Sequence, residues 1–258
     1  MENIKNVFEY SDMIVSLVKR DLRGRYKGSV LGFLWTLINP LFQLIIYTLV
    51  FSIILRSNIE DYYLFLFVAL VPWSFFSASV HAGSFCVWSQ KGMVNKIYFP
   101  RAVLPISHVI SQLVNLLLSF IIVFFALILS GKEVNFGALL ILPGIVVIEF
   151  VLALGIAFIV SALAVFFNDL MQILGILVML WQFLTPVMYP IEDIPQHMQI
   201  YFKINPMTPI ITAYRDVLYY AQIPEIGTLA SAGLFSVIIL VAGWLIFGKL
   251  ERHFSEVL

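Results

Sequence analysis

The segment GWLIFGKL, residues 243–250, has the spacing of a phosphate-binding loop. Gly243, Gly248 and Lys249 match the pattern G-x-x-x-x-G-K-[ST], in which backbone N–H groups surround a phosphate and the lysine neutralises it. The pattern requires Ser or Thr after the lysine to hold Mg²⁺, but Leu250 stands there. The residues between the glycines are large and apolar. We therefore interpret the segment as the end of a membrane helix, with Lys249 at the water boundary.

Other residues that commonly perform chemistry are scattered along the chain. The histidines lie on separate segments, and neither an H-E-x-x-H metal motif nor a G-x-S-x-G nucleophile motif occurs. Cys86 is the single cysteine, which excludes an intrachain disulfide and a multi-cysteine metal site. We therefore predict no catalytic residue and no metal site. The histidines are His81, His108, His197 and His253.

Glu149 is the clear ionisable residue within an apolar stretch. An acid inside a membrane is a candidate for proton coupling. The alternative is a carboxyl group that lies near the outer boundary or forms a hydrogen bond with a neighbouring helix. We favour the alternative because the sequence shows no partner for a proton relay.

The composition indicates an integral membrane protein. Of the 258 residues, 61% are hydrophobic and 12% are charged, whereas soluble domains are about 45–50% apolar and about 25% charged. A single water-soluble core would not cover so much apolar surface. The formal net charge is zero, which gives no argument for nucleic acid as a partner.

Hydropathy predicts an all-α protein with six transmembrane helices, because a crossing needs about 20 apolar residues. The expected spans are 31–55, 62–86, 102–130, 139–167, 171–189 and 229–248. Eleven of the fifteen Lys and Arg residues lie in segments on the side of the amino terminus, so the positive-inside rule places both termini in the cytoplasm. We expect one domain, 1–258, consisting of a cytoplasmic amphipathic helix (1–29), spans one to five (30–189), an extracytoplasmic re-entrant segment (190–228), span six (229–248) and a cytoplasmic tail (249–258).

Two segments outside the spans have informative patterns. Residues 4–27 place apolar side chains at helical spacing with Lys and Arg largely off that stripe, which predicts an amphipathic helix on the inner membrane surface. The alternative is a basic flank that only orients the chain. Residues 190–224 contain five of the eleven prolines, and they are too broken to span and too apolar for a solvated loop. We expect two short re-entrant helices there.

Aromatic and amide side chains accumulate along the first and fifth expected spans. Aromatic rings stack on the C–H faces of sugars and amides bond hydroxyl groups, so these residues are candidates for lining a passage. The alternative is the ordinary packing and interfacial aromatic residues of membrane proteins. The candidates are Trp35, Asn39, Phe42, Gln43, Tyr47 and Phe51 in the first span and Trp181, Gln182, Phe183, Thr185 and Tyr189 in the fifth.

The stretch RGRYKGSVLGFLWTLINP, residues 23–40, resembles the membrane subunit of ABC-type polysaccharide exporters, which move O-antigen, teichoic acid or capsule precursors. In that family a basic amphipathic helix enters the first span through an R-Y-x-x-[ST]-x-L-G-x-x-W segment. Further matches follow in order, so the resemblance covers nearly the whole chain. They are ALVPW at 69–73, NKIYFPRAVLP at 95–105, FFNDL at 166–170, TPVMYP at 185–190 and NPMTPIITAYRDVL at 205–218.

The resemblance implies a permease that forms a channel from two copies, lined by spans one and five, in a bacterial cytoplasmic membrane. A separate nucleotide-binding subunit would bind ATP and Mg²⁺, so this chain would be no enzyme and would hold no cofactor. The cargo would be a polymer on a polyprenyl diphosphate carrier. An O-antigen-like polysaccharide is favoured, because teichoic acid exporters usually have a longer amino-terminal segment.

The resemblance also implies roles for residues outside the channel. Coupling to the ATPase subunit is expected at Lys91, Asn95, Lys96, Arg101, Asn168, Asp169 and Leu170. An outer gate is expected at Tyr201, Pro206 and Tyr214. Contact with the diphosphate of the carrier, or equally with anionic lipid headgroups, is expected at Arg20, Arg23 and Arg25.

Other functions stay open at this point. The same fold would serve a teichoic acid exporter or an exporter of small molecules or drugs, which differ in their cargo. A membrane-embedded glycan-modifying enzyme would need a cluster of His, Asp or Glu at one membrane face, which the sequence does not contain. A passive channel or scaffold would work without an ATPase partner.

Overall fold

The computed structural model describes residues 7, 9–26, 31, 34–50, 59–94, 96–167 and 169–257, and the regular structure of these ranges is entirely helical. The all-α class that the sequence predicts is confirmed. The elements are α2 (Ser11–Tyr26), α3 (Trp35–Thr48), α4 (Tyr62–Phe85), η3 (Trp88–Gln90), α5 (Lys91–Val94), α6 (Val103–Ser130), α7 (Phe136–Leu139), α8 (Leu142–Phe166), α9 (Leu170–Phe183), η4 (Ile191–Asp193), α10 (Gln199–Ile204), α11 (Met207–Leu218), α12 (Ile226–Leu250), η5 (Glu251–His253) and α13 (Phe254–Val257).

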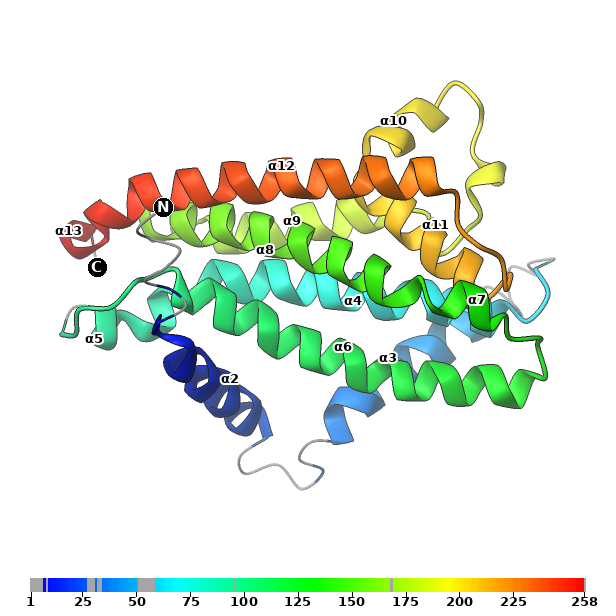
Figure 1. Cartoon of the computed structure of the whole chain (residues 1–258), viewed down its shortest axis with the longest axis horizontal. Coiled ribbons are helices and arrows are strands. Elements are labelled where there is room, and N and C mark those ends of the chain that lie inside the picture. The colour runs from blue at the N-terminus through cyan, green and yellow to red at the C-terminus, as the bar shows by residue number, and fades with distance from the viewer. Residues whose placement is uncertain are drawn as a thin grey trace.

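Four long helices, α4, α6, α8 and α12, form the body of the molecule (Figure 1). Helices α4, α6 and α8 alternate in direction, and α12 runs parallel to α8. Helices α5 and α13 lie at one end of this bundle. We call it the basic end after the cations in α5, in the following loop and at the end of α12. The opposite end, where α7 and α11 lie, is called the far end.

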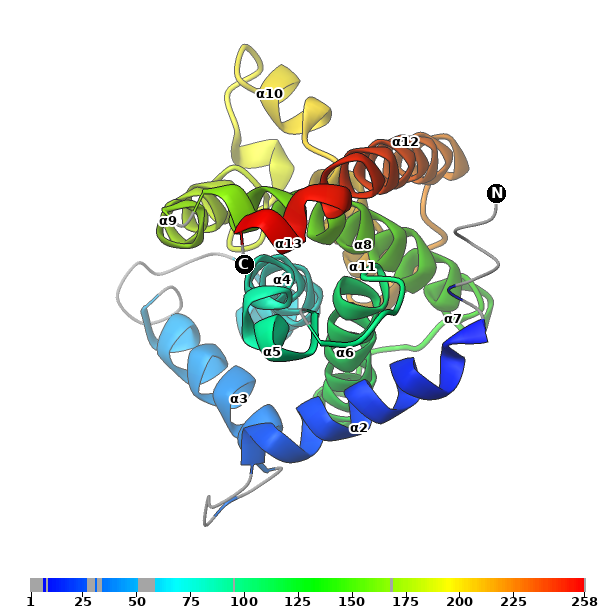
Figure 2. The same cartoon turned by 90° about the vertical axis from the view of Figure 1, so that its left-hand side faces the viewer.

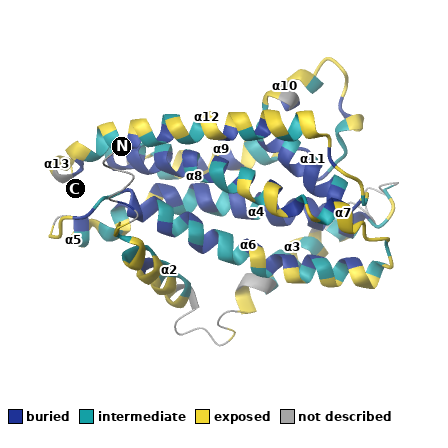
Figure 3. Ribbon diagram, in the orientation of Figure 1, coloured by how far each residue is buried: buried dark blue, intermediate teal, exposed yellow. Residues whose placement is uncertain are grey.

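Helix α4 is the centre of the bundle. It packs against α3, α6, α8, α9 and α11, and 78% of its most apolar stretch is buried, against 22% for α12. Figure 3 shows the same difference, with buried residues along α4 and exposed residues along the outer faces of α6 and α12. Exposed apolar faces around a buried central helix are the arrangement expected of a bundle that faces lipid.

Four of the six predicted spans are found as helices long and apolar enough to cross a membrane. They correspond to α4, α6, the run Phe136–Phe166 that contains α7 and α8, and the run Ile226–His253 that contains α12. Their length and composition identify an integral membrane protein.

The first and fifth predicted spans correspond to the shorter helices α3 and α9. Each has 14 residues, a length of about 21 Å at 1.5 Å per residue. The prediction that the fifth span continues to residue 189 differs from the structure, in which α9 ends at Phe183. Pro186 explains the early end, because it removes a backbone donor and disfavours helical geometry at Thr185.

Helices α8 and α12 make the most extensive contact in the bundle, and two glycines permit it. A Cβ atom on Gly243 would overlap the carbonyl oxygen of Gly155, and one on Gly155 would lie 2.6 Å from the backbone nitrogen of Leu240. Small residues of this kind let membrane helices approach backbone to backbone. Gly243, which begins the loop-like motif, is therefore a packing residue.

The remaining motif residues agree with this interpretation. The rings of Trp244 and Phe247 pack on Phe158 of α8 at centroid distances of 5.3 and 5.4 Å, and Phe247 is 1% exposed. A Cβ atom on Gly248 would meet nothing within 4 Å. The segment is part of a continuous helix that ends at Leu250, as predicted from its apolar residues.

The glycine contact predicts a difference between two otherwise similar substitutions. Gly243→Ala should lower the melting temperature of the purified protein in detergent, because overpacking costs about 1–3 kcal/mol. Gly248→Ala is the control, and it should leave the melting temperature unchanged or raise it, since alanine favours a helix interior. Equal losses in the two variants would contradict the packing role and revive a shared role for the motif.

Candidate functional site

The predicted channel residues of the first span lie along α3, which flanks α4 on the side away from α12 (Figure 2). Trp35 and Phe42 are 38% and 57% exposed, and Asn39 and Gln43 are also exposed. Amides beside aromatic rings on an uncovered helix face suit a hydroxyl-rich ligand better than lipid, because an unpaired amide in hydrocarbon is costly. Two predicted lining groups fall outside the described residues, namely Phe51 and the side chain of Tyr47.

The predicted channel residues of the fifth span divide into two kinds. Phe183 is 56% exposed and Gln182 is half-buried at the end of α9. Thr185 is fully buried, and its hydroxyl donates to the carbonyl oxygen of Trp181 at 2.8 Å. Tyr189 is half-buried and donates to the carbonyl oxygen of Phe183. Within one chain, Thr185 supports the end of α9 and presents no surface to a passage.

Trp181 also has a structural partner. Its indole N–H donates to the side-chain oxygen of Asn205 at 2.8 Å, and its ring meets Phe76 of α4 edge-on at 5.0 Å between centroids. The side chain is half-buried. Trp181 therefore joins α9 to both the central helix and the segment before α11, which sequence reasoning did not foresee.

Asn205 is the residue at which these contacts converge. Its side-chain N–H₂ donates to the carbonyl oxygen of Leu184 at 2.9 Å and to the hydroxyl of Thr185 at 2.8 Å. Its side-chain oxygen accepts from Trp181 and from the backbone N–H of Met207 at 3.0 Å. The last contact is local and lies at the start of α11, whereas the other three are long-range contacts that the sequence did not show.

Arg215 of α11 holds the connection that follows α9. Only 4% of this residue is exposed, and its guanidinium donates to the carbonyl oxygens of Val187 at 2.6 Å and Tyr189 at 3.2 Å. It also lies 3.7 Å from the ring centroid of Phe65, a cation–π distance. Tyr62 of α4 donates to the carbonyl oxygen of Met188 at 2.8 Å. Non-helical backbone carbonyls thus find donors inside the protein.

Glu149 does have a partner in the structure. The hydroxyl of Tyr214 donates to its Oε2 atom at 2.8 Å, and both residues are 0% exposed. The prediction that Glu149 bonds a neighbouring helix is therefore confirmed, with α11 as that helix.

The three predicted gate residues differ in how far each is buried. Tyr201 of α10 is 67% exposed, and Pro206 is a half-buried residue immediately before α11. Tyr214 is fully buried and committed to Glu149. Tyr214 therefore anchors α11 to α8, while Tyr201 is the gate candidate with a free surface.

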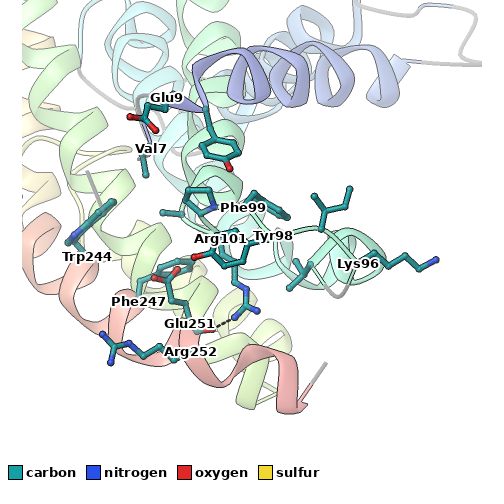
Figure 4. Close-up of a pocket in the computed structure, with 16 residues that line it drawn as sticks. Val7, Glu9, Lys96, Tyr98, Phe99, Arg101, Trp244, Phe247, Glu251 and Arg252 are labelled. Atoms are coloured by element: carbon teal, nitrogen blue, oxygen red, sulfur yellow. Dashed lines mark hydrogen bonds between the residues drawn. The ribbon is translucent and has the colours of Figure 1, made fainter. Parts of the chain in front are cut away.

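The predicted coupling residues surround the basic end. A pocket of about 950 Å³ lies there between the start of the described chain, the 94–102 loop and the end of α12 (Figure 4). Lys96 and Arg101 line it, and the guanidinium of Arg101 donates to the carbonyl oxygen of Glu251. Tyr98 is 96% exposed beside them. This end of the molecule presents cations and an exposed aromatic ring together.

Trp88 joins the first predicted coupling segment to the last turn of α8, which lies just before the second. Its indole N–H donates to the carbonyl oxygen of Ala164, in the last turn of α8, at 3.2 Å. Lys91 lies over its ring at 5.1 Å. Asp169 is exposed, and Leu170 packs against the core. Two further coupling candidates, Asn95 and Asn168, fall outside the described residues.

Helix α2 lies within the amino-terminal segment 4–27 and packs against α6. Arg20 and Arg23 are exposed on it, whereas the side chain of Arg25 lies outside the description. His108 Nδ1 of α6 lies 3.8 Å from Asp21 Oδ1 of α2, a distance that would permit an ion pair when the histidine is protonated. Across the described part of the chain, no three His, Cys, Asp or Glu side chains gather as metal ligands.

These features define a class: a helical integral membrane protein whose buried polar groups join its helices to one another. The family model described as ABC-2 type transporter matches residues 13–219. The chain belongs to the ABC-2 type transporter family.

Relatives are similar over nearly their whole length. The O-antigen export system permease protein RfbA of Myxococcus xanthus is 34% identical, over 98% of each chain. The protein of the same name from Klebsiella pneumoniae is 30% identical, over 96% of this chain and 95% of its own. The polysialic acid transport protein KpsM of Escherichia coli is 25% identical, over 95% and 96%. This chain is thus similar to permeases of surface polysaccharide.

The contacts of Asn205 predict its importance for stability. Asn205→Ala should lower the melting temperature of the purified protein and open residues 184–206 to protease, because each buried donor or acceptor left unpaired costs about 1–3 kcal/mol. Gln196→Ala removes an exposed amide from the same segment and serves as the control. Unchanged proteolysis and melting in Asn205→Ala would show that this cluster does not hold the segment.

Proposed function

We propose that this chain is the channel-forming permease subunit of an ATP-driven exporter that moves lipid-linked surface polysaccharide across a bacterial cytoplasmic membrane. The observation that carries the proposal is the similarity of 30–34% to O-antigen export permeases over almost the entire chain. The polysialic acid relatives are less similar, at 25%. An O-antigen-like polymer on a polyprenyl diphosphate is therefore the better-supported cargo.

Two copies of the chain would enclose the passage, each with six spans counting α3 and α9. Both helices pack on α4 and leave faces uncovered in the single chain. The uncovered face of α3 carries Trp35, Phe42 and two amides, a composition that suits sugar rings and hydroxyls. Pairing of two copies through these faces would remove the amides from lipid and place them along the polymer.

Energy would come from a separate ABC ATPase subunit, which would hold ATP and Mg²⁺ and would contact this chain at the basic end. The basic end and both termini would face the cytoplasm. Cations and the exposed Tyr98 would contact that subunit. The bond from Trp88 to Ala164 supports a route for the movement, because it ties the 88–101 segment to the last turn of α8, which precedes α9 in the chain. Closure of the ATPase would thus act at the end of α8, next to the start of α9.

The far end would carry the outer gate, formed by α10 and α11 as re-entrant helices. Arg215, Asn205 and Tyr214 support this role, since they satisfy polar groups of a segment that does not span. Tyr201 would be the side chain nearest the leaving polymer. At the other end α2 would lie on the inner membrane surface, where Arg20, Arg23 and Arg25 would meet phosphate groups.

The first test is affinity purification of the tagged full-length chain from its native membrane, with mass spectrometry of its partners. The proposal predicts a second copy and a P-loop ATPase in equal amounts. The purified chain alone should hydrolyse no ATP. A homo-oligomer without ATPase in every detergent would contradict the exporter and favour a passive channel.

The second test concerns the proposed lining. Trp35→Ala with Phe42→Ala should lower surface polysaccharide severalfold at unchanged membrane levels of the protein, because stacking on aromatic side chains contributes to passage. Phe235→Ala is the matched control, since Phe235 is 40% exposed, close to Trp35 at 38%, but lies on α12. Export that falls equally in the control, or in neither variant, would remove α3 from the lining.

A further inference from the structure

A second, smaller pocket lies where α2 crosses the beginning of α6. It has a volume of about 360 Å³, within the range of about 300–1,000 Å³ typical of small-ligand sites. Leu17 of α2 and Leu104 of α6 form apolar wall, and they are 8% and 0% exposed. The polar wall includes Arg20, Asp21 and Gln90. The apolar wall therefore suits a hydrocarbon chain, and the polar wall suits a charged group.

Arg20 supplies the charge of the polar wall. It lines the pocket, is exposed, and makes no ion pair with any residue that the structure describes. Asp21 lies beside it but is 3.8 Å from the Nδ1 atom of His108 across the pocket. That contact ties α2 to α6 and engages Asp21, which leaves the guanidinium of Arg20 for a ligand. Guanidinium groups bind phosphate through paired N–H donors.

Two further residues fit a phosphate group. The side-chain amide of Gln90, which follows α4 in η3, lines the pocket and makes no hydrogen bond to a described residue, so its N–H₂ group can donate. Gly24, one turn after Arg20 on α2, leaves space, because a Cβ atom there would meet nothing within 4 Å. Three elements thus converge on the cavity, and among the described residues neither the guanidinium of Arg20 nor the side-chain amide of Gln90 has a partner.

We infer that this pocket binds the phosphate headgroup of a membrane lipid, with Arg20 and Gln90 on the phosphate oxygens and the chain following the apolar wall. Basic pockets between membrane helices commonly take such headgroups. The source of the phosphate is either the diphosphate carrier of the cargo or a resident anionic phospholipid. The first source rests on the proposed function, whereas the second does not.

The test measures lipid binding to the purified full-length chain in phosphatidylcholine nanodiscs. The probes are farnesyl diphosphate, phosphatidylglycerol and inorganic pyrophosphate. Arg20→Gln should weaken binding of the preferred lipid about tenfold or more, because a charge-assisted hydrogen bond contributes about 1.5–3 kcal/mol. Gly24→Leu fills the pocket without changing its charge and should weaken binding similarly. Lys19→Gln removes the same charge from an exposed neighbour outside the pocket, and it should have little effect.

The outcomes separate the sources. Preference for farnesyl diphosphate that depends on Arg20 and Gly24 supports the carrier, and the same dependence for phosphatidylglycerol supports a resident phospholipid. Equal weakening by Lys19→Gln and Arg20→Gln, or no effect of Gly24→Leu in protein that remains monodisperse, would overturn the assignment. Lipid binding with this dependence in a protein that exports no polysaccharide would contradict the proposed function and leave the pocket assignment standing.

Discussion

The structure depends on one constraint, that polar backbone in a membrane protein needs a partner within the protein. The connection after α9 breaks the helix and leaves the carbonyl groups of residues 187–189 without helical donors. Arg215 donates to the first and third, and Tyr62 donates to the second. Burying an arginine costs free energy unless its N–H groups are hydrogen-bonded. The free carbonyl groups of residues 187–189 supply those acceptors, and Arg215 in turn supplies the donors that these carbonyl groups lack. The position of α11 against α4 follows from this exchange.

The same constraint accounts for the bonds that join the elements of the far end. Glu149 and Tyr214 join α8 to α11, and Asn205 joins the end of α9 to the start of α11. Each of these bonds links elements that are distant in sequence and that meet only in the folded chain. A displacement of α9 would therefore act on the start of α11 through Asn205, while Tyr214 holds α11 against α8. In the proposed exporter, the link between α9 and α11 would let a movement that starts at the cytoplasmic face reach the outer gate.

Hydropathy alone was sufficient for the four long spans, because each is a continuous apolar run that nothing interrupts. It was insufficient for α9, where Pro186 ends the helix although the apolar run goes on. For the candidate site, residue type alone selected Trp35 and Phe42, and the structure shows that both are exposed on α3. The site was not predictable where a side chain bonds to a distant carbonyl group. Trp88 with Ala164 and Arg215 with Val187 are pairings of this kind, which leave no periodic trace in the sequence.

The glycine contact between α8 and α12 limits which parts can move. Backbones that touch at Gly155 and Gly243 cannot slide without opening a gap that neither glycine can fill, so these helices form a rigid pair. Helix α4 is buried against α8 and extends that unit. Helices α3 and α9 are attached to its side mainly through α4, and each keeps an uncovered face. A passage between two copies would therefore widen by displacing α3 and α9 on a fixed scaffold, and the loop-like motif of α12 belongs to the part that stays still.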